Sequence, residues 1–359
     1  MMCGRGPVGK PGVHLRHRRS PDALVSDCTA MRVGVYFDLR NPPPWLQDPA
    51  RLYAFTLELC EEAERLGAAS VWLSEHHLFD DGYLPQPLTF AAAVAARTKR
   101  VRIGTAVLLA PLRSAVQIAE EVAVVDLVSD GRVDLGLGAG YRVPEFELFD
   151  ADISKRYGTT DARVRELREI WADGRVTPAP VQARVPIWLG YQGPQGARRA
   201  GVLGEGLLSG SAHLLEPYQD GLRAAGFPDT AARMTGSFQG FVTDDPEGDW
   251  PVVSRHLAYQ LDSYRRYMVE GTDAPVPRPI DPDRVRSRDS DAPLGSFLYG
   301  TPEEVATAIR VRTAGAPVET VFLWASVGGM SEAMTARHVH TICTRLAPLL
   351  ADGEADDRV

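Results

Sequence analysis

The sequence lacks the features that define several large classes of protein. No apolar run is long enough to span a bilayer, so we expect no transmembrane helix and no membrane partner. Cysteine is scarce, and the four cysteines share no spacing typical of zinc or redox sites, which favours a reducing, cytoplasmic location. No G-x-S-x-G nucleophile elbow occurs, so the usual motif for a catalytic serine is missing.

The sequence also lacks an excess of positive charge. Its net charge is −8 and its isoelectric point is near 5.6, which argues against nucleic acid as a partner because phosphate-backbone binding requires a basic face. Residues 1–30, by contrast, carry more basic than acidic residues and show no hydrophobic period. We therefore predict a disordered basic tail there, with a basic binding arm as the alternative. Met31 is an alternative start of translation, and the acidic tail 351–359 is expected to fray.

What the sequence does contain is a long alternation of apolar runs and helix-period segments. The first four runs are apolar throughout, as expected for a parallel sheet covered by helices. The pattern predicts an α/β fold, a (β/α)8 TIM barrel over residues 31–350, with an open doubly wound sheet as the alternative. Polar, proline-rich residues 271–293 predict an insertion or lid before the last βα unit. The expected strands are 32–37, 70–73, 101–109, 133–137, 186–189, 206–209, 235–242 and 318–324.

The end of the second expected strand carries three titratable residues in a row, Glu75, His76 and His77. Barrel enzymes build their sites from the loops that follow the strands, so these residues are the candidate catalytic group. Neighbouring side chains on an extended segment point to opposite sides, so we expect one histidine to face the barrel mouth, as an acid or base or as a hydrogen-bond donor. We predict no metal site, because the other strand ends supply no convincing second ligand cluster.

A glycine-rich turn after the fifth expected strand, 190–199, leads into a helix that carries two arginines. Free amides at a helix start attract anions, so the turn predicts a phosphate site; an ordinary turn with surface arginines is the alternative. The glycines at 136, 138 and 140 lack the spacing of a dinucleotide fingerprint, and small residues there would let a flat ring approach the backbone. These features favour a phosphorylated, planar cofactor that carries the reactivity itself.

Five segments, in this order along the chain, resemble those of the bacterial luciferase-like flavin monooxygenases. The resemblance covers most of residues 31–350. The segments are 72–77 (WLSEHH), 103–111, 126–146, 186–206 and 300–305.

The resemblance implies a TIM barrel that binds reduced FMN, or a deazaflavin in one branch, at the carboxyl ends of its strands. It implies that His76 is catalytic, with Glu75 and His77 as supports, and that reduced FMN reacts with O2 to give a C4a-peroxyflavin. The peptide between Ala106 and Val107 corresponds to a non-proline cis peptide that bulges against the flavin. The remaining residues that the resemblance assigns to the cofactor are Gly138, Ala139 and Tyr141 near the ring, and Gln192, Gly193 and Gly196 around the phosphate.

Two positions depart from the family pattern. Ala139 stands where the luciferase branch has a phosphate-binding arginine, with Arg142, Arg198 or Arg199 as candidate substitutes. Ser114 begins the pair that replaces the usual His-Pro.

The implied function is a monooxygenase that acts on an apolar or aromatic small molecule, with a separate flavin reductase as partner and a homodimer as the assembly. A deazaflavin-dependent hydride-transfer enzyme and a flavin-binding protein without catalysis are the alternatives.

Overall fold

The computed structural model describes residues 31–285 and 297–351. The expected tail at 1–30, most of the acidic tail and residues 286–293 of the expected lid lie outside the described residues.

The described strands close into a parallel barrel, which confirms the predicted fold. The hydrogen-bonded order runs β3-β2-β1-β11-β8-β7-β6-β5, and a parallel pairing of β3 with β5 closes the ring. All pairings in the ring are parallel, as helical crossovers require. The barrel strands are β1 (Arg32–Phe37), β2 (Ser70–Leu73), β3 (Arg102–Thr105), β5 (Val133–Gly138), β6 (Ile187–Leu189), β7 (Gly206–Leu208), β8 (Met234–Phe238) and β11 (Val318–Trp324).

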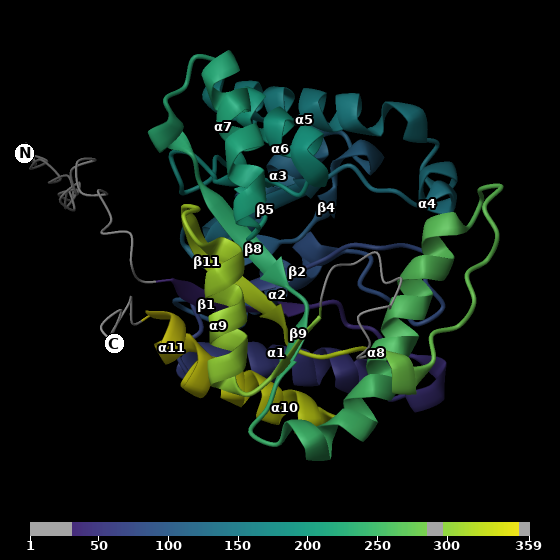
Figure 1. Cartoon of the computed structure of the whole chain (residues 1–359). Helices are drawn as coiled ribbons and strands as arrows, with labels where there is room; N and C mark the ends of the chain where they lie inside the picture. Colours follow the sequence, from purple (N-terminus) through teal and green to yellow (C-terminus); the bar gives the residue numbers. More distant parts are fainter. Residues whose placement is uncertain (1–30, 286–296, 352–359) are drawn as a thin grey trace, which may run out of the picture.

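Helices surround the strands (Figure 1). Local signals explain several of their boundaries: Thr301 and Glu304 form a capping box at the start of α9, and α1 ends next to Gly67, whose φ is +95°. The helices around the barrel are α1 (Pro49–Arg65), α2 (Pro87–Arg97), α3 (Ala115–Ser129), α5 (Arg156–Ala172), α6 (Gly193–Val202), α7 (Leu215–Ala224), α9 (Pro302–Thr313), α10 (Glu332–Thr341) and α11 (Ala347–Ala351).

The third expected strand, 101–109, is interrupted. β3 ends at Thr105, the Ala106–Val107 peptide is cis, and the chain resumes as β4 (Leu108–Leu109). A Cβ atom on Gly138 would lie 2.3 Å from Val107 Cγ2, and one on Gly190 would lie 2.5 Å from Val107 Cγ1. Gly138 on β5 and Gly190 just after β6 therefore make room for the Val107 side chain.

The insertion in the barrel is larger than predicted. The expected strand 235–242 divides into β8 and β9 (Gly240–Val242), which leaves the barrel and pairs with β10 (Leu298–Gly300). Between them runs α8 (Pro246–Val269), which, together with α4 (Val143–Leu148), lies at the right-hand end of the barrel in Figure 1. The side-chain Oε1 of Gln260 on α8 accepts a hydrogen bond from the Gly328 amide after β11, so α8 lies over the carboxyl ends of the strands.

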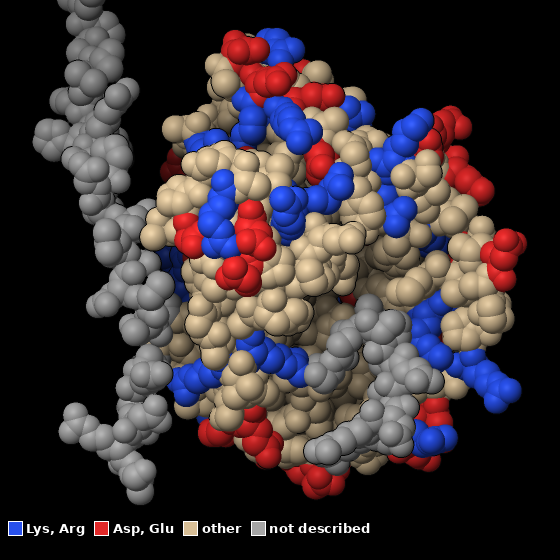
Figure 2. Space-filling model, turned by 45° about the horizontal axis from the view of Figure 1, so that its top comes forward, with Lys and Arg blue, Asp and Glu red and all other residues tan. Residues whose placement is uncertain are grey.

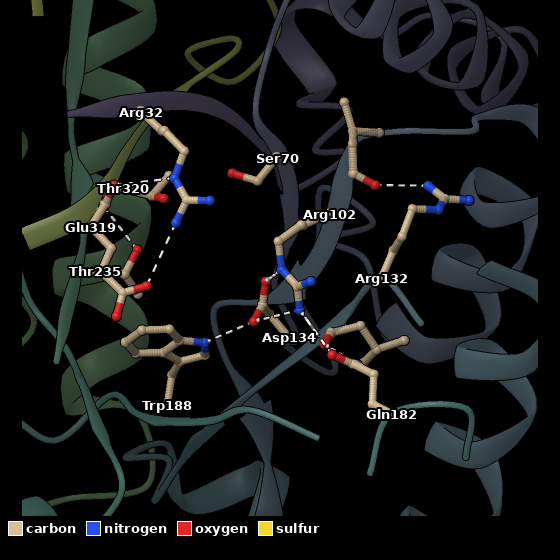
Figure 3. A network of polar contacts seen from close by, with 12 residues as sticks. Arg32, Ser70, Arg102, Arg132, Asp134, Gln182, Trp188, Thr235, Glu319 and Thr320 are labelled. Atoms are coloured by element: carbon tan, nitrogen blue, oxygen red, sulfur yellow. Dashed lines mark hydrogen bonds and ion pairs between the residues drawn. The ribbon is translucent and has the colours of Figure 1, made fainter. Parts of the chain in front are cut away.

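The opposite end of the barrel is held by a network of polar side chains (Figure 3). Arg102, at the start of β3, forms a 2.5 Å ion pair with Asp134 on β5, and Trp188 Nε1 on β6 donates to the same carboxylate at 3.1 Å. Arg32 and Glu319 make a longer contact of 3.6 Å between β1 and β11. These side chains link neighbouring strands, so this end of the barrel has a stabilising role, as is usual for the amino-terminal face of such barrels.

The outer surface carries charges of both signs. Figure 2 shows Lys and Arg interspersed with Asp and Glu on one face, which is hollowed near its centre by a depression lined mainly with uncharged residues. Many exposed charges are paired, such as Arg223 with Glu216 at 2.9 Å. Exposed pairs of this kind add only about 0–1 kcal/mol each, so burial of the core stabilises the fold.

Candidate active site

His76, just past β2, is hydrogen-bonded to a buried carboxylate. Its Nδ1 lies 2.8 Å from Oε1 of Glu145, and the same oxygen accepts the backbone N–H of His77 at 2.8 Å. Glu145 lies in the first turn of α4 and is fully buried. Because a carboxylate accepts hydrogen bonds, His76 donates through Nδ1, and Nε2 is left facing the Tyr141 hydroxyl at 3.5 Å.

Aromatic rings enclose the His76 imidazole. Phe79 stacks on it with ring centroids 4.6 Å apart, and the edges of Tyr83 and Tyr141 lie at 4.8 and 5.3 Å. Tyr264, from α8, approaches to 6.3 Å. Only 9% of His76 is exposed, so the imidazole can exchange a proton in a setting from which most water is excluded.

Glu75 and His77 lie on the other side of the chain. Glu75 accepts hydrogen bonds from Arg113 at 2.6 Å and from the Leu109 amide at 2.6 Å, and its Oε1 lies 3.0 Å from His77 Nε2. These contacts tie the end of β2 to β4 and to the start of the next helix. Of the three adjacent residues, His76 is the one that contacts Phe79, Tyr83 and Tyr141.

Three arginines are candidates to replace the phosphate-binding arginine that is missing at Ala139, and each has different contacts. Arg142 is buried, donates to the His77 and Leu78 carbonyls and forms a 2.5 Å ion pair with Glu270 at the end of α8. Its guanidinium also lies 4.6 Å from the centroid of the Tyr267 ring. Arg142 thus fastens the loop after His76 to α8 rather than pointing to an anion.

The other two candidate arginines are carried by α6. Arg199 forms a 2.6 Å ion pair with Asp161 on α5, whereas Arg198 is exposed. Ser114 has a local role, because it is the N-cap of α3 and accepts from the Gln117 amide at 3.2 Å.

The start of α6 presents open backbone donors. Gln192 is the N-cap and makes no side-chain cap bond, Gly193 has a φ of +68°, and Pro194 contributes no N–H. The amides of Gly193 and Gln195 therefore remain for a ligand, whereas the Gly196 amide is the first donor within the helix and bonds to the Gln192 carbonyl. This turn follows Gly190, which packs on Val107, so the turn into α6 lies next to the segment that follows the cis peptide.

A second buried cluster of polar and aromatic residues, which the sequence did not predict, lies on the opposite side of the mouth. Arg40, after β1, forms a 2.6 Å ion pair with Asp81 and donates to Ser263 on α8. Its guanidinium lies 5.0 Å from the centroid of the Tyr264 ring. Burial raises the pKa of the neighbouring Asp38 to about 6, with Arg40 acting in the opposite direction. No local sequence pattern marks Arg40 or Tyr264 as part of a site.

Two features are absent from residues 31–285 and 297–351. These ranges contain no group of three or more His, Cys, Asp and Glu side chains placed to hold a metal ion. Within the same ranges, no helix has the length and apolarity needed to cross a bilayer.

The fold and the site place the protein among the (β/α)8 barrels whose chemistry lies at the carboxyl ends of the strands. The family model described as luciferase-like monooxygenase matches residues 31–319, so the chain belongs to that family.

Curated relatives in this family use two kinds of coenzyme. The chain is 33% identical over 190 residues to an F420-dependent glucose-6-phosphate dehydrogenase from Amycolatopsis mediterranei, covering 47% of this chain and 57% of the relative. It is 30% identical over 166 residues to the oxygenase component of the flavin-dependent trigonelline monooxygenase of Acinetobacter baylyi, covering 41% and 46%. The chain thus spans about half the length of these relatives.

Solved structures match over nearly the whole chain. The crystal structure of monooxygenase RslO1 from Streptomyces bottropensis gives a TM-score of 0.71 at 26% identity, covering 89% of this chain and 99% of that one. The oxygenating constituent of 3,6-diketocamphane monooxygenase from Pseudomonas putida, in complex with FMN, gives 0.66 at 18% identity, with coverage of 89% and 99%. The second match shows the shared fold alone.

Proposed function

We propose that this protein is an FMN-dependent monooxygenase that acts on an apolar or aromatic small molecule. The observation that carries the proposal is the His76–Glu145 pair, set among aromatic rings at the mouth of a luciferase-like barrel. The similarity to the monooxygenase RslO1 over most of both chains supports the same reading.

The residues on one side of the mouth fit FMN. The start of α6, which has no side-chain cap, offers the amides of Gly193 and Gln195 to a phosphate, and the positive helix end favours its charge. The Val107 side chain, backed by Gly138 and Gly190, provides a firm apolar surface for a flat ring. When bound and reduced, FMN would supply the electrons that activate O2.

The chain's own groups have separate roles in this proposal. Glu145 holds His76 Nδ1, so that Nε2 is free to accept or return a proton at the reacting centre. Phe79, Tyr83 and Tyr141 exclude water from that imidazole. Glu75 and His77 act through packing and hydrogen bonds behind the loop. A separate flavin reductase would deliver reduced FMN to this cytoplasmic enzyme, and α8 would cover the site as a lid.

A deazaflavin-dependent hydride transfer is the second candidate. It is favoured by Ala139, which replaces the phosphate-binding arginine of the luciferase branch, and by the similarity to an F420-dependent dehydrogenase. Such an enzyme would need no oxygen.

Cofactor-specific turnover distinguishes these functions. Purified protein is supplied with a panel of aromatic substrates and either a reductase-generated pool of reduced FMN in air or reduced F420 under argon. We expect substrate-dependent oxygen uptake with FMN, and its loss in His76→Ala. Turnover with F420 alone would establish the second candidate. Background oxygen uptake in both wild type and His76→Ala, with FMN bound, would indicate a flavin-binding protein without catalysis.

The assembly is expected to be a homodimer that forms through α3. Beside Gln117 and Glu120, the exposed side of this helix carries large apolar residues, among them Val116 and Val124, which are 51% and 49% exposed. Exposed apolar side chains gathered on one helix favour burial against a partner. Sedimentation of Val124→Glu as a monomer, beside a dimeric wild type, would support this arrangement; a monomeric wild type would refute it.

A further inference from the structure

A cavity outside the aromatic wall of the candidate active site has no role in the proposed function. Its volume is about 550 Å³, within the range of about 300–1,000 Å³ that is typical of small-molecule sites. It lies between the loop after β2, which contributes Leu78, and the end of α8, which contributes Tyr267 and Glu270. The segment that follows α8, as far as Val276, forms the remaining wall.

This cavity is separate from the candidate active site. His76 stacks on Phe79, the rings of Phe79 and Tyr267 have centroids 3.9 Å apart, and Tyr267 lines the cavity. The Tyr267 hydroxyl is fixed by Asp80, because it donates to Oδ1 at 2.7 Å and accepts from the Asp80 amide at 2.8 Å. Two aromatic rings therefore stand between the imidazole and the cavity.

Leu78 has an unusual backbone conformation for a residue that packs so little. Its φ is +58°, in the left-handed region that Gly or Asn ordinarily occupies, because a Cβ atom there crowds the following carbonyl oxygen. Arg142 holds this conformation by donating to the Leu78 carbonyl at 3.2 Å. The side chain is nevertheless 57% exposed, so the fold gains little from a leucine here. A ligand in contact with Leu78 accounts for the apolar side chain at this position.

Val276 adds a second exposed apolar side chain to the same cavity. It lies on the segment after α8 and is 73% exposed. Single exposed apolar residues are ordinary, but two that line one cavity offer apolar surface to a flat ring.

The charged residues that line the cavity are paired, so the site favours a neutral ligand. Asp80 forms a 3.0 Å ion pair with Arg266, which is also at the cavity. Glu270, whose side chain is 44% exposed, forms a 2.5 Å ion pair with the buried Arg142. The Arg142 contacts use Oε2, and Oε1 of Glu270 has no hydrogen-bond partner among the described residues. Because a carboxylate oxygen accepts hydrogen bonds, the ligand group beside it is an N–H or an O–H.

We infer that this cavity binds a small, neutral aromatic molecule that carries one N–H or O–H donor. The ring of the ligand rests on Leu78 and Val276, and its donor bonds to Oε1 of Glu270. The site lies outside the proposed monooxygenase mouth, so the inference goes beyond the proposed function and does not depend on FMN.

Indole and benzofuran test the inference, because benzofuran has the same ring system with an oxygen in place of the N–H. Their binding to the full-length protein, without FMN, is measured by ligand-observed NMR. Val276→Asn removes apolar surface from the cavity, and Val311→Asn, at a valine on α9 that is 72% exposed, is the matched control. Leu78→Asn makes the same change within the left-handed conformation, which asparagine tolerates.

We expect the wild type and Val311→Asn to bind indole about fivefold more tightly than benzofuran, the size of one net hydrogen bond. Val276→Asn and Leu78→Asn should each weaken indole binding about fivefold, because the ring loses an apolar contact. A wild type that binds no indole, equal affinities for indole and benzofuran, or equal indole binding by Val276→Asn and Val311→Asn would overturn the inference.

Glu270→Met tests the hydrogen bond itself. It should remove the preference for indole over benzofuran, and a preference that persisted would overturn the assignment of Oε1. Thermal unfolding of each variant shows whether it is folded. Val276→Asn breaks no ion pair, so its comparison with Val311→Asn decides the inference even if the loss of Glu270 unfolds the protein.

Discussion

His76 Nδ1 and Glu145 Oε1 lie 2.8 Å apart, although 69 residues separate them in the chain. The barrel brings the loop after β2 against the first turn of α4, and the buried carboxylate then fixes the orientation of the imidazole. A histidine held in this way presents one defined nitrogen to the reacting centre, which is the arrangement that proton transfer requires.

Replacing Glu145 by glutamine should impair turnover without unfolding the protein. The amide keeps the volume, but it removes the charge that sets the His76 tautomer, so kcat should fall about tenfold to a hundredfold and the pH profile should shift. Steady-state kinetics with reduced FMN check this. Glu147→Gln, an exposed carboxylate on the same helix, is the control and should leave kcat within about twofold. Equal kcat values for the two variants would contradict the role given to Glu145.

Glu75 should matter for stability through Arg113. Both side chains are buried, so Arg113→Met leaves an uncompensated carboxylate and should cost about 3–5 kcal/mol in denaturant unfolding. Adding Glu75→Gln to that variant should recover most of the loss. Arg51→Met, which breaks an exposed pair with Glu332, should cost less than about 1 kcal/mol. A double variant as unstable as Arg113→Met would show that the pairing does not explain the effect.

Asp38→Asn should stabilise the protein at neutral and basic pH. Burial raises the pKa of Asp38 from 3.8 to about 6, so the folded state binds its proton more tightly than the unfolded state. The cost of the buried charge, about 3 kcal/mol, is therefore present above pH 6 and disappears as the pH falls towards 3.8. Unfolding at pH 8 and pH 4 should show the gain only at pH 8. The same gain at both values would contradict this.

His338 should act in the opposite direction over the same pH range. Burial lowers its pKa from 6.5 to about 4, so the unfolded state binds the proton more tightly. Its contribution to stability is present above pH 6.5, and about 3 kcal/mol is lost as the pH falls to 4. In the Asp38→Asn background, His338→Phe should reduce this loss of unfolding free energy between pH 6.5 and pH 4. It should also cost about 2 kcal/mol at pH 7, because the Val242 amide and the Ala325 carbonyl lose their partner. If the free energy of unfolding depended on pH in the same way with and without His338, that residue would not be the source of the loss.

The sequence predicts what is encoded locally. Apolar runs mark the barrel strands, and Thr301 with Pro302 marks the start of α9, because strand burial and helix capping depend on residues close in the chain. The cis peptide at Ala106–Val107 was reached only through the family resemblance. No local pattern separates β9 from β8 or identifies the three-residue β10, since both depend on pairing between distant segments.

The candidate site divides in the same way. His76 and the start of α6 are recognisable because strand ends and glycine-rich helix starts have local signals. Glu145, Arg40 and Tyr264 are not, because each acquires its role from a partner more than forty residues away. The periodicity of α8 predicts a helix, but nothing in it tells that this helix crosses the barrel mouth.

The central claim, that α6 holds the phosphate of FMN, is tested most directly by calorimetric titration of the full chain with FMN, riboflavin and F420. Riboflavin lacks the phosphate. Gln195→Asp adds a carboxylate to the first turn of α6, where a negative charge does not disfavour the helix. We predict that the wild type binds FMN at least about tenfold more tightly than riboflavin, and that Gln195→Asp removes this difference while leaving riboflavin binding unchanged. Equal affinities for FMN and riboflavin in the wild type, or binding of F420 without FMN, would contradict the account.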